Sequence, residues 1–171
     1  VREKDGLWAI LLWLNILAVR QQSVAAIMAE HWAKFGRNYY SRHDFEAIAT
    51  DKADAMMAAL RASLPGLAGR AIEGMTIAAA DDFAYTDPVD GSVSQNQGVR
   101  ILFSDGSRIV LRLSGTGTEG ATLRLYLERY AAGPEGLDLD PQAALAPVIR
   151  AAHALAGIAE YTGRSEPNVI T

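Results

Sequence analysis

A turn of glycines and hydroxyl residues joins two alternating segments in the stretch Arg112-Leu113-Ser114-Gly115-Thr116-Gly117-Thr118-Glu119-Gly120-Ala121-Thr122-Leu123-Arg124. Alternate residues of a strand point to opposite faces, so Arg112 and Ser114 share one face while Leu111 and Leu113 share the other. The segment after the turn alternates in the same way. This pattern predicts a hairpin that returns Arg124 to the same loop.

The turn has the composition of an anion-binding loop. Its candidate phosphate-binding residues are Arg112, Ser114, Gly115, Thr116, Gly117, Thr118 and Arg124. The glycines allow positive φ and a close approach of backbone N–H groups, the hydroxyls add donors, and the two arginines supply planar, bidentate charge. The stretch has neither a Walker lysine nor a GxGxxG pattern. A glycine-rich hairpin with two solvated arginines remains the alternative interpretation.

Charge and composition limit the possible functions. The net charge of -4 argues against a nucleic-acid partner, although residues 100–130 hold five arginines and three acids and are therefore locally basic. No cysteine is present, which excludes a disulfide framework and a thiolate zinc site and fits a reducing cytosol. The three histidines are isolated in the sequence, so no metal site is expected.

The N-terminal part of the chain predicts two helices. The run Leu7–Val19 is apolar almost all round, but it is shorter than the roughly 20 residues of a membrane span and lacks signal-peptide order. We expect a buried helix that needs cover on every face, and hence that Val1 is a cut end with upstream sequence missing. A second helix is expected within Gln21–Asn38 and ends at Gly36.

A domain boundary is predicted at about Gly36–Ser41. There Ser41-Arg42-His43-Asp44 has the form of a capping box, which predicts the start of a new helix that continues past Phe45 and Ile48 to Leu60. His31 and His43 are interpreted as surface or packing residues, because neither has a predictable acidic partner.

From Arg70 the apolar period becomes two. Strands are expected at Ile72–Ala80, Asp82–Tyr85, Val99–Phe103, Arg108–Leu113 and Thr122–Tyr130, of which the last also fits helical spacing. The Asp105-Gly106 pair is the clearest hairpin signal. Aspartates that invite a metal interpretation are better explained as turn formers: Asp81, Asp82, Asp87 and Asp90.

A closing helix is predicted to begin at Asp140-Pro141 and to end near Gly163, with Pro147 kinking or splitting it. From about Tyr39 onward the order is therefore helix, antiparallel sheet and helix, which is an α+β fold.

Four segments resemble the phosphoglucomutase branch of the α-D-phosphohexomutase superfamily. They are Arg2-Glu3-Lys4-Asp5-Gly6-Leu7-Trp8-Ala9, His31-Trp32-Ala33-Lys34-Phe35-Gly36-Arg37-Asn38-Tyr39-Tyr40, Asp87-Pro88-Val89-Asp90-Gly91-Ser92 and Arg112-Leu113-Ser114-Gly115-Thr116-Gly117. The resemblance covers nearly the whole chain and corresponds to the C-terminal part of such an enzyme.

The resemblance implies an intramolecular phosphotransferase that interconverts glucose 1-phosphate and glucose 6-phosphate through glucose 1,6-bisphosphate. Residues 1–38 would be the last helices of its third, α/β domain, and residues 39–171 its fourth domain, a TATA-binding-protein-like antiparallel sheet flanked by helices. A phosphoserine loop, a loop that holds Mg²⁺ and a sugar-reading loop lie upstream in the family. Carbohydrate metabolism in the cytoplasm, phosphosugar and the upstream domains as partners, and no membrane or nucleic-acid partner are expected.

Family roles carry over residue by residue. Arg112, Ser114, Gly115, Thr116, Gly117, Thr118 and Arg124 resemble the grip on the phosphate that is not being transferred. Lys4 resembles the active-site lysine near the transferring phosphoryl group, although a lysine in an Arg-Glu-Lys-Asp run is ordinarily solvated. Glu119 departs from an anion-binding loop unless its carboxylate points outward.

Two hypotheses follow. In the first, the chain is the substrate-phosphate-binding end of a phosphoglucomutase and is inactive alone. In the second, it is a stand-alone phosphate-binding or interaction module without catalysis, and an uncovered helix at Leu7–Val19 argues against that independence.

Overall fold

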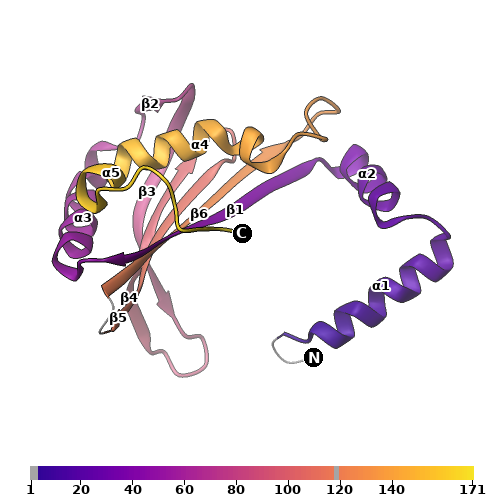
Figure 1. Cartoon of the computed structure of the whole chain (residues 1–171), viewed down its shortest axis with the longest axis horizontal. Helices are drawn as coiled ribbons and strands as arrows, with labels where there is room; N and C mark the ends of the chain where they lie inside the picture. The colour runs from indigo at the N-terminus through magenta and orange to yellow at the C-terminus, as the bar shows by residue number, and fades with distance from the viewer. Residues whose placement is uncertain (1–3, 118–119) are drawn as a thin grey trace. The chain divides into compact units, whose positions relative to one another are not determined.

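The computed structural model describes residues 4–117 and 120–171 and divides into two compact units. The first comprises Val1–Arg37 with Ala131–Leu137, and the second comprises Asn38–Tyr130 with Asp138–Thr171. Figure 1 gives the element labels used below.

The first unit contains the two predicted helices. Helix α1 spans Gly6–Arg20 and begins where the Asp5 side chain accepts a hydrogen bond from the Trp8 N–H at 2.9 Å. Helix α2 spans Val24–Phe35 and is bent from α1 by 88°. No residue of α1 is buried, and Leu7 is 77% exposed. The expected apolar helix therefore forms, but within this unit it lies uncovered.

Neither described helix is by itself long and apolar enough to cross a membrane. Helices α1 and α2 meet the criteria of length and composition only when they are taken together across their bend.

The second unit is built on a seven-stranded sheet in the order β2-β3-β4-β5-β6-β1-β7. The strands are β1 (Arg37–Ile48), β2 (Ala71–Ile72), β3 (Met75–Thr86), β4 (Val93–Phe103), β5 (Arg108–Gly117), β6 (Gly120–Ala131) and β7 (Val169–Ile170). Neighbouring strands run antiparallel in the registers β1–β7, β2–β3, β3–β4, β4–β5 and β5–β6. The α+β class predicted for this part of the chain is confirmed.

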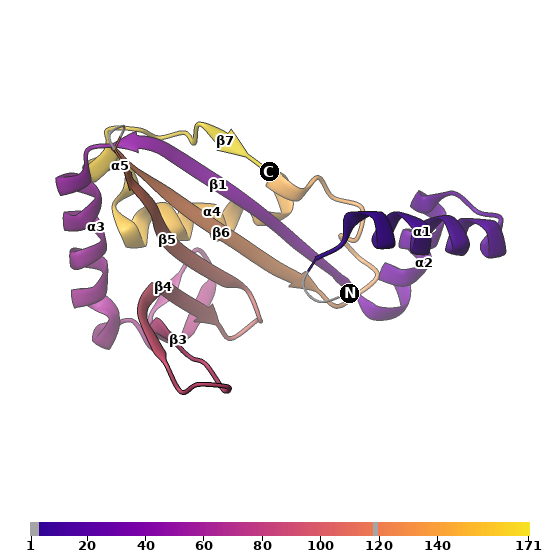
Figure 2. The ribbon, with the colours of Figure 1, turned by 90° about the horizontal axis from the view of Figure 1, so that it is seen from below.

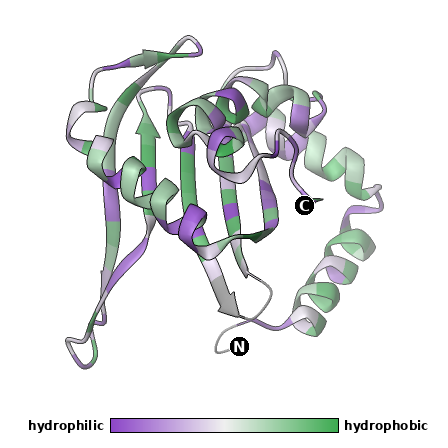
Figure 3. Ribbon diagram, turned by 60° about the vertical axis from the view of Figure 1, so that its left-hand side comes forward, coloured by the Kyte–Doolittle hydropathy of each residue, from purple (hydrophilic) through white to green (hydrophobic). Residues whose placement is uncertain are grey.

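Helices cover one face of this sheet and leave the other open (Figures 1 and 2). They are α3 (Thr50–Ser63), α4 (Pro141–Ala156) and α5 (Ile158–Thr162), with a short 3-10 turn η1 at Leu64–Gly66. The core lies between helices and sheet, where green apolar segments alternate with purple ones along the strands (Figure 3). Its fully buried side chains include Phe45, Met56, Leu60, Leu111, Leu123, Leu125 and Leu145.

The prediction that a helix starts at Ser41 is wrong, because this segment belongs to the long strand β1. Its inward residues Tyr39, Ser41, His43 and Phe45 are all buried and recur with period two. Helix α3 begins only at Thr50, after an Ala49 N-cap that makes no side-chain hydrogen bond. The capping-box pattern at Ser41–Asp44 therefore does not mark the start of a helix.

Other boundaries also differ from the prediction. The segments expected as Ile72–Ala80 and Asp82–Tyr85 form the short β2 and one continuous β3, separated by a tight turn at Glu73 and Gly74 with φ of 50° and 77°. Thr122–Tyr130 is strand and not helix. Helix α4 continues through Pro147, and the break comes instead at Gly157, whose left-handed backbone ends α4.

Candidate phosphate-binding site

The hairpin of β5 and β6 has the predicted face assignment. Arg112 pairs directly with Arg124, and Ser114 pairs with Thr122. Leu111 and Leu123 are fully buried under the helices, whereas Arg112 is exposed on the open face. Directly paired residues of antiparallel strands place their side chains on the same face, so both arginines belong to the open face of the sheet.

The hairpin tip lies close to the end of β1. Gly120 opens β6 with φ of 92°, and a β-carbon at this position would come within 2.7 Å of the Ile48 carbonyl oxygen. Only glycine tolerates both the left-handed backbone and this close approach. The glycine predicted for an anion loop is thus required here by backbone conformation and packing.

Three arginines in and beside the hairpin, Arg42, Arg100 and Arg108, pair with a carboxylate. Arg100 binds Asp81 through two hydrogen bonds of 2.8 and 2.6 Å, and its guanidinium lies 4.5 Å from the Phe83 ring centre. The hydrogen bonds from Arg100 lower the pKa of the Asp81 carboxyl, and Asp81 in turn raises the pKa of Arg100.

Two further ion pairs flank the hairpin. Arg108 pairs with Glu128. The Arg42 Nε lies 2.9 Å from an Asp44 carboxylate oxygen, within ion-pair distance, although these two atoms do not form a hydrogen bond. The positive charges of Arg42 and Arg108 are therefore balanced by carboxylates of the same domain.

The paired arginines Arg112 and Arg124 differ from these neighbours. Among residues 4–117 and 120–171, neither makes an ion pair or a side-chain hydrogen bond, and the Arg124 Nε is buried without an acceptor. Like charges directly opposite on neighbouring strands are unfavourable. A bound dianion would relieve this repulsion and supply the acceptor that the Arg124 Nε lacks.

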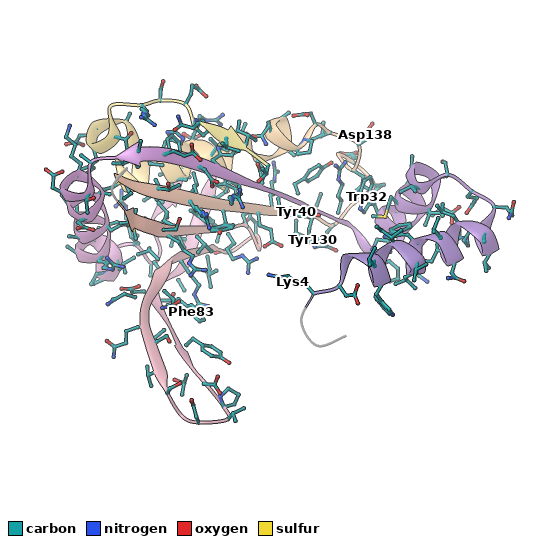
Figure 4. All side chains as sticks on the ribbon, turned by 60° about the horizontal axis from the view of Figure 1, so that its bottom comes forward. Lys4, Trp32, Tyr40, Phe83, Tyr130 and Asp138 are labelled. Atoms are coloured by element: carbon teal, nitrogen blue, oxygen red, sulfur yellow. The ribbon has the colours of Figure 1, made fainter. Side chains whose placement is uncertain are left out.

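Arg112 stands between two hollows on the open face. The first, of about 520 Å³, extends over β5, β6 and β1 and is lined by Tyr40, Arg42, Arg108, Tyr126 and others. The second, of about 390 Å³, extends over β3, β4 and β5. Its lining includes Phe83, Tyr85, Ser94, Gln97 and Gly98. Figure 4 labels one aromatic residue from each hollow, Tyr40 and Phe83. The arginine can therefore be approached from both sides.

The remaining predicted residues fall into three groups. Ser114 lies half-buried on β5, opposite Thr122. Gly115, Thr116 and Gly117 follow it in the β5 backbone, and Thr118 lies with Glu119 outside the described residues. Lys4 belongs to the first unit and is exposed just before the N-cap of α1. Its catalytic role stays a prediction, as do the roles of the loop residues.

Each of the four aspartates that invited a metal interpretation has a hydrogen-bond or ion-pair partner within the chain. Asp87 accepts a hydrogen bond from the Val89 N–H at 2.7 Å, and Asp90 accepts one from the Ser92 N–H at 2.8 Å, as expected of turn formers. Asp81 and Asp82 instead lie on β3, and Asp82 pairs with Arg61 at 2.7 Å. Their interpretation as turn residues is corrected, because they are strand ion-pair partners.

Within the described part of the chain, no group of three histidine or acidic residues is arranged to hold a metal ion. These residues thus offer no donor set for Mg²⁺, whose ligands the family resemblance places upstream.

Gly98 was missed by the sequence interpretation, although it lines the hollow beside Arg112. The sequence did not place it there, because a two-residue loop at Asp105-Gly106 would pair Val99 with Arg112. The observed hairpin closes between Phe103 and Ser107 and pairs Val99 with Leu111, so Gly98 is the residue of β4 nearest Arg112.

Comparison with known proteins gives the family. Residues 37–168 match the model "Phosphoglucomutase-1, C-terminal domain", and residues 1–35 match "Phosphoglucomutase/phosphomannomutase, alpha/beta/alpha domain III". Over its whole length the chain is 59% identical to phosphoglucomutase of Rhizobium radiobacter and 49% identical to human phosphoglucomutase-1. It spans 32% of the length of each.

A solved structure agrees with these matches. The open form of pp63/parafusin, a phosphoglucomutase from Paramecium, superposes with a TM-score of 0.86 at 44% identity, covering 100% of this chain and 30% of that one. Both the sequence and the fold therefore show that the chain belongs to the phosphoglucomutase family.

Proposed function

We propose that the chain acts as part of a phosphoglucomutase that interconverts glucose 1-phosphate and glucose 6-phosphate through glucose 1,6-bisphosphate. In this proposal its hairpin grips the substrate phosphate that is not being transferred. The observation that carries the proposal is the pairing of Arg112 with Arg124 on an open sheet face. Arg42, Arg100 and Arg108 nearby pair with carboxylates, whereas Arg112 and Arg124 pair with none among the described residues.

The chemistry explains why such a grip is useful. Phosphoryl transfer depends on positioning and on charge stabilisation, so binding energy from a remote phosphate can align the reacting oxygen. A pair of guanidinium forks reads phosphate geometry and not the sugar. The same grip therefore accepts the bisphosphate in either orientation, which the exchange between two isomers requires.

The hydroxyl and amide donors of Ser114, Gly115, Thr116, Gly117 and Thr118 complete the grip in this proposal. Residues 39–171 then form the domain that closes over the cleft, and residues 1–38 complete the third domain. Lys4 meets the substrate near the transferring phosphoryl group. The phosphoserine and the Mg²⁺ ligands come from upstream domains of the same cytoplasmic protein, so the chain alone is inactive.

Binding by the chain itself is the first test. We expect saturable shifts of the Ser114 and Thr122 amide resonances when the isotopically labelled chain is titrated with glucose 1,6-bisphosphate. Arg112→Ala weakens this binding strongly but measurably. Arg150→Ala, which removes an arginine of α4 that pairs with Glu73, leaves it unchanged. Saturation of Arg112→Ala at the same ligand concentration as the unmodified chain would contradict the proposed grip.

Activity is the second test. A chimera that joins the chain to the upstream domains of the Rhizobium radiobacter relative restores the missing loops in a 59% identical context. We expect mutase activity in this chimera, and a fall of kcat/KM by about two to three orders of magnitude with Arg112→Ala, the loss typical of a charge-stabilising donor. Bisphosphate binding without any activity of the chimera would favour a stand-alone phosphate-binding module.

A further inference from the structure

Arg112 has two neighbours across the sheet, and they differ greatly in size. On the β6 side its direct partner is Arg124. On the β4 side the paired residues end at Val99 and Leu111, and the next residue of β4 beside Arg112 is Gly98, which has no side chain. Arg112 thus lies between Arg124, which carries a like charge, and Gly98, from which no side chain projects.

The side chain of Arg112 occupies that empty position. A β-carbon built on Gly98 would lie 2.6 Å from the Arg112 Cγ and 3.4 Å from its Cδ. It would also lie 2.9 Å from the Leu111 carbonyl oxygen. The aliphatic stem of Arg112 therefore rests on the backbone of β4, in space that any other residue at position 98 would fill.

The local backbone is built to hold a glycine there. The β3–β4 register shifts between the pairs Phe83–Gly98 and Tyr85–Ser94, so β4 carries extra residues at this point. Asn96 has φ of 55°, and Gly98 itself has φ of 154°, which side-chain-bearing residues rarely adopt. Bulges of this kind commonly re-aim a strand beside a functional site.

We propose that Gly98 is a positioning residue that sets the separation between the guanidinium groups of Arg112 and Arg124. A side chain at position 98 would push the Arg112 stem toward Arg124, which raises their repulsion and narrows the gap that an anion enters. This inference rests on the proposed phosphate grip, and it adds a residue that never touches the phosphate.

Gly98→Ala tests the inference in the isotopically labelled chain, with inorganic phosphate and glucose 1,6-bisphosphate as probes. We expect binding of both probes to weaken by about ten- to a hundred-fold, since displacing a positioned group by about 1 Å has effects of this size. Gly106→Ala is the matched control, because Gly106 also has positive φ but would bring its β-carbon within 4 Å of nothing. The control should bind both probes within about two-fold of the unmodified chain.

A double substitution separates positioning from general damage. If Gly98 acts through Arg112, adding Gly98→Ala to Arg112→Ala causes no further loss of phosphate binding. A further loss would overturn the inference. Normal binding by Gly98→Ala alongside weak binding by Arg112→Ala would also overturn it while leaving the grip intact. Normal binding by Arg112→Ala would instead reject the grip itself.

A measurement on the unmodified chain covers the case in which Gly98→Ala does not fold. Nuclear Overhauser contacts between the Gly98 Hα and the Arg112 side-chain methylenes are expected both without and with saturating phosphate. Loss of these contacts on phosphate binding would show that Arg112 leaves β4 to act, and would overturn the positioning role.

Discussion

The Nε2 atom of His43 lies 2.9 Å from the side-chain oxygen of Gln142, and this contact ties β1 to the first turn of α4. The Gln142 amide nitrogen donates to the Ser41 hydroxyl at 3.0 Å, and that hydroxyl donates to the Thr171 backbone oxygen at 3.0 Å. One glutamine thus connects a strand, a helix and the segment that follows β7.

Replacing Gln142 by leucine should lower the free energy of unfolding by about 1–3 kcal/mol, because His43 and Ser41 are buried and would each lose a partner. Urea unfolding followed by circular dichroism measures this change. Gln95→Leu serves as the control, because Gln95 is exposed on β4. Equal stability of the two variants would show that the buried hydrogen bonds of Gln142 make no net contribution to the free energy of unfolding.

His153 makes the stability of the second unit sensitive to acid. Burial lowers the pKa of His153 below its usual 6.5, the neighbouring charge of His43 lowers it further, and Glu166 partly opposes both. The ring of His153 also packs edge-on against Phe45, with ring centres 5.7 Å apart. The neutral imidazole is therefore the form that the folded state favours.

Because the folded pKa is depressed, the unfolded chain binds more protons as the pH falls below 6.5. The stabilisation is complete above this pH and is lost on acidification toward the folded pKa. We expect His153→Phe to reduce the slope of unfolding free energy between about pH 7 and pH 5, whereas His31→Phe, at an exposed position of α2, leaves the slope as it is. Identical slopes for all three proteins would refute this origin of acid sensitivity.

The repulsion between Arg112 and Arg124 predicts opposite effects on stability and on binding. Arg112→Gln keeps most of the stem and removes one charge, so the ligand-free chain should become more stable by about 0.2–1 kcal/mol at low salt. Phosphate should raise the melting temperature of the unmodified chain, as expected for a ligand that binds only the folded state, and should not raise that of the variant.

Differential scanning fluorimetry with and without phosphate measures both effects. Arg108→Gln is the control, because it removes a neighbouring arginine that pairs with Glu128 and so should not stabilise the chain. A melting temperature of Arg112→Gln that is lower than normal without phosphate would argue that the two arginines do not repel each other in solution.

The local pattern of apolar and polar residues correctly predicted features that depend only on residues close together in the sequence, namely strand faces and turns. The alternation around Leu111 and Arg112 gave the correct faces of β5, and Asp105-Gly106 gave the correct turn, with Gly106 at φ of 85°. The segment from Ser41 is a strand for a physical reason. Its four-residue capping pattern lies within a longer period-two pattern, whose inward residues Tyr39 and Phe45 are almost completely buried against the core.

Other features depend on contacts between distant segments and could not be inferred locally. The close approach of Gly120 to Ile48 joins the hairpin tip to the end of β1, and a glycine in the sequence does not reveal what its missing side chain avoids. The roles of Lys4 and of the loop residues came from family resemblance. The sheet register was also needed to show that Arg100 and Arg108 pair with carboxylates whereas Arg112 and Arg124, among the described residues, do not.

The contact between Gly120 and Ile48 gives the last prediction. Gly120→Ala places a β-carbon 2.7 Å from a backbone oxygen and forces alanine to φ of 92°, so the free energy of unfolding should fall by about 1–3 kcal/mol. Gly74→Ala is the matched control, because Gly74 has φ of 77° but its added β-carbon would have no neighbour within 4 Å. Urea unfolding of both variants separates the two contributions, since the control measures backbone strain alone. If the two variants lose equal stability, the close approach to Ile48 has no energetic effect, and the requirement for glycine at the hairpin tip is purely conformational.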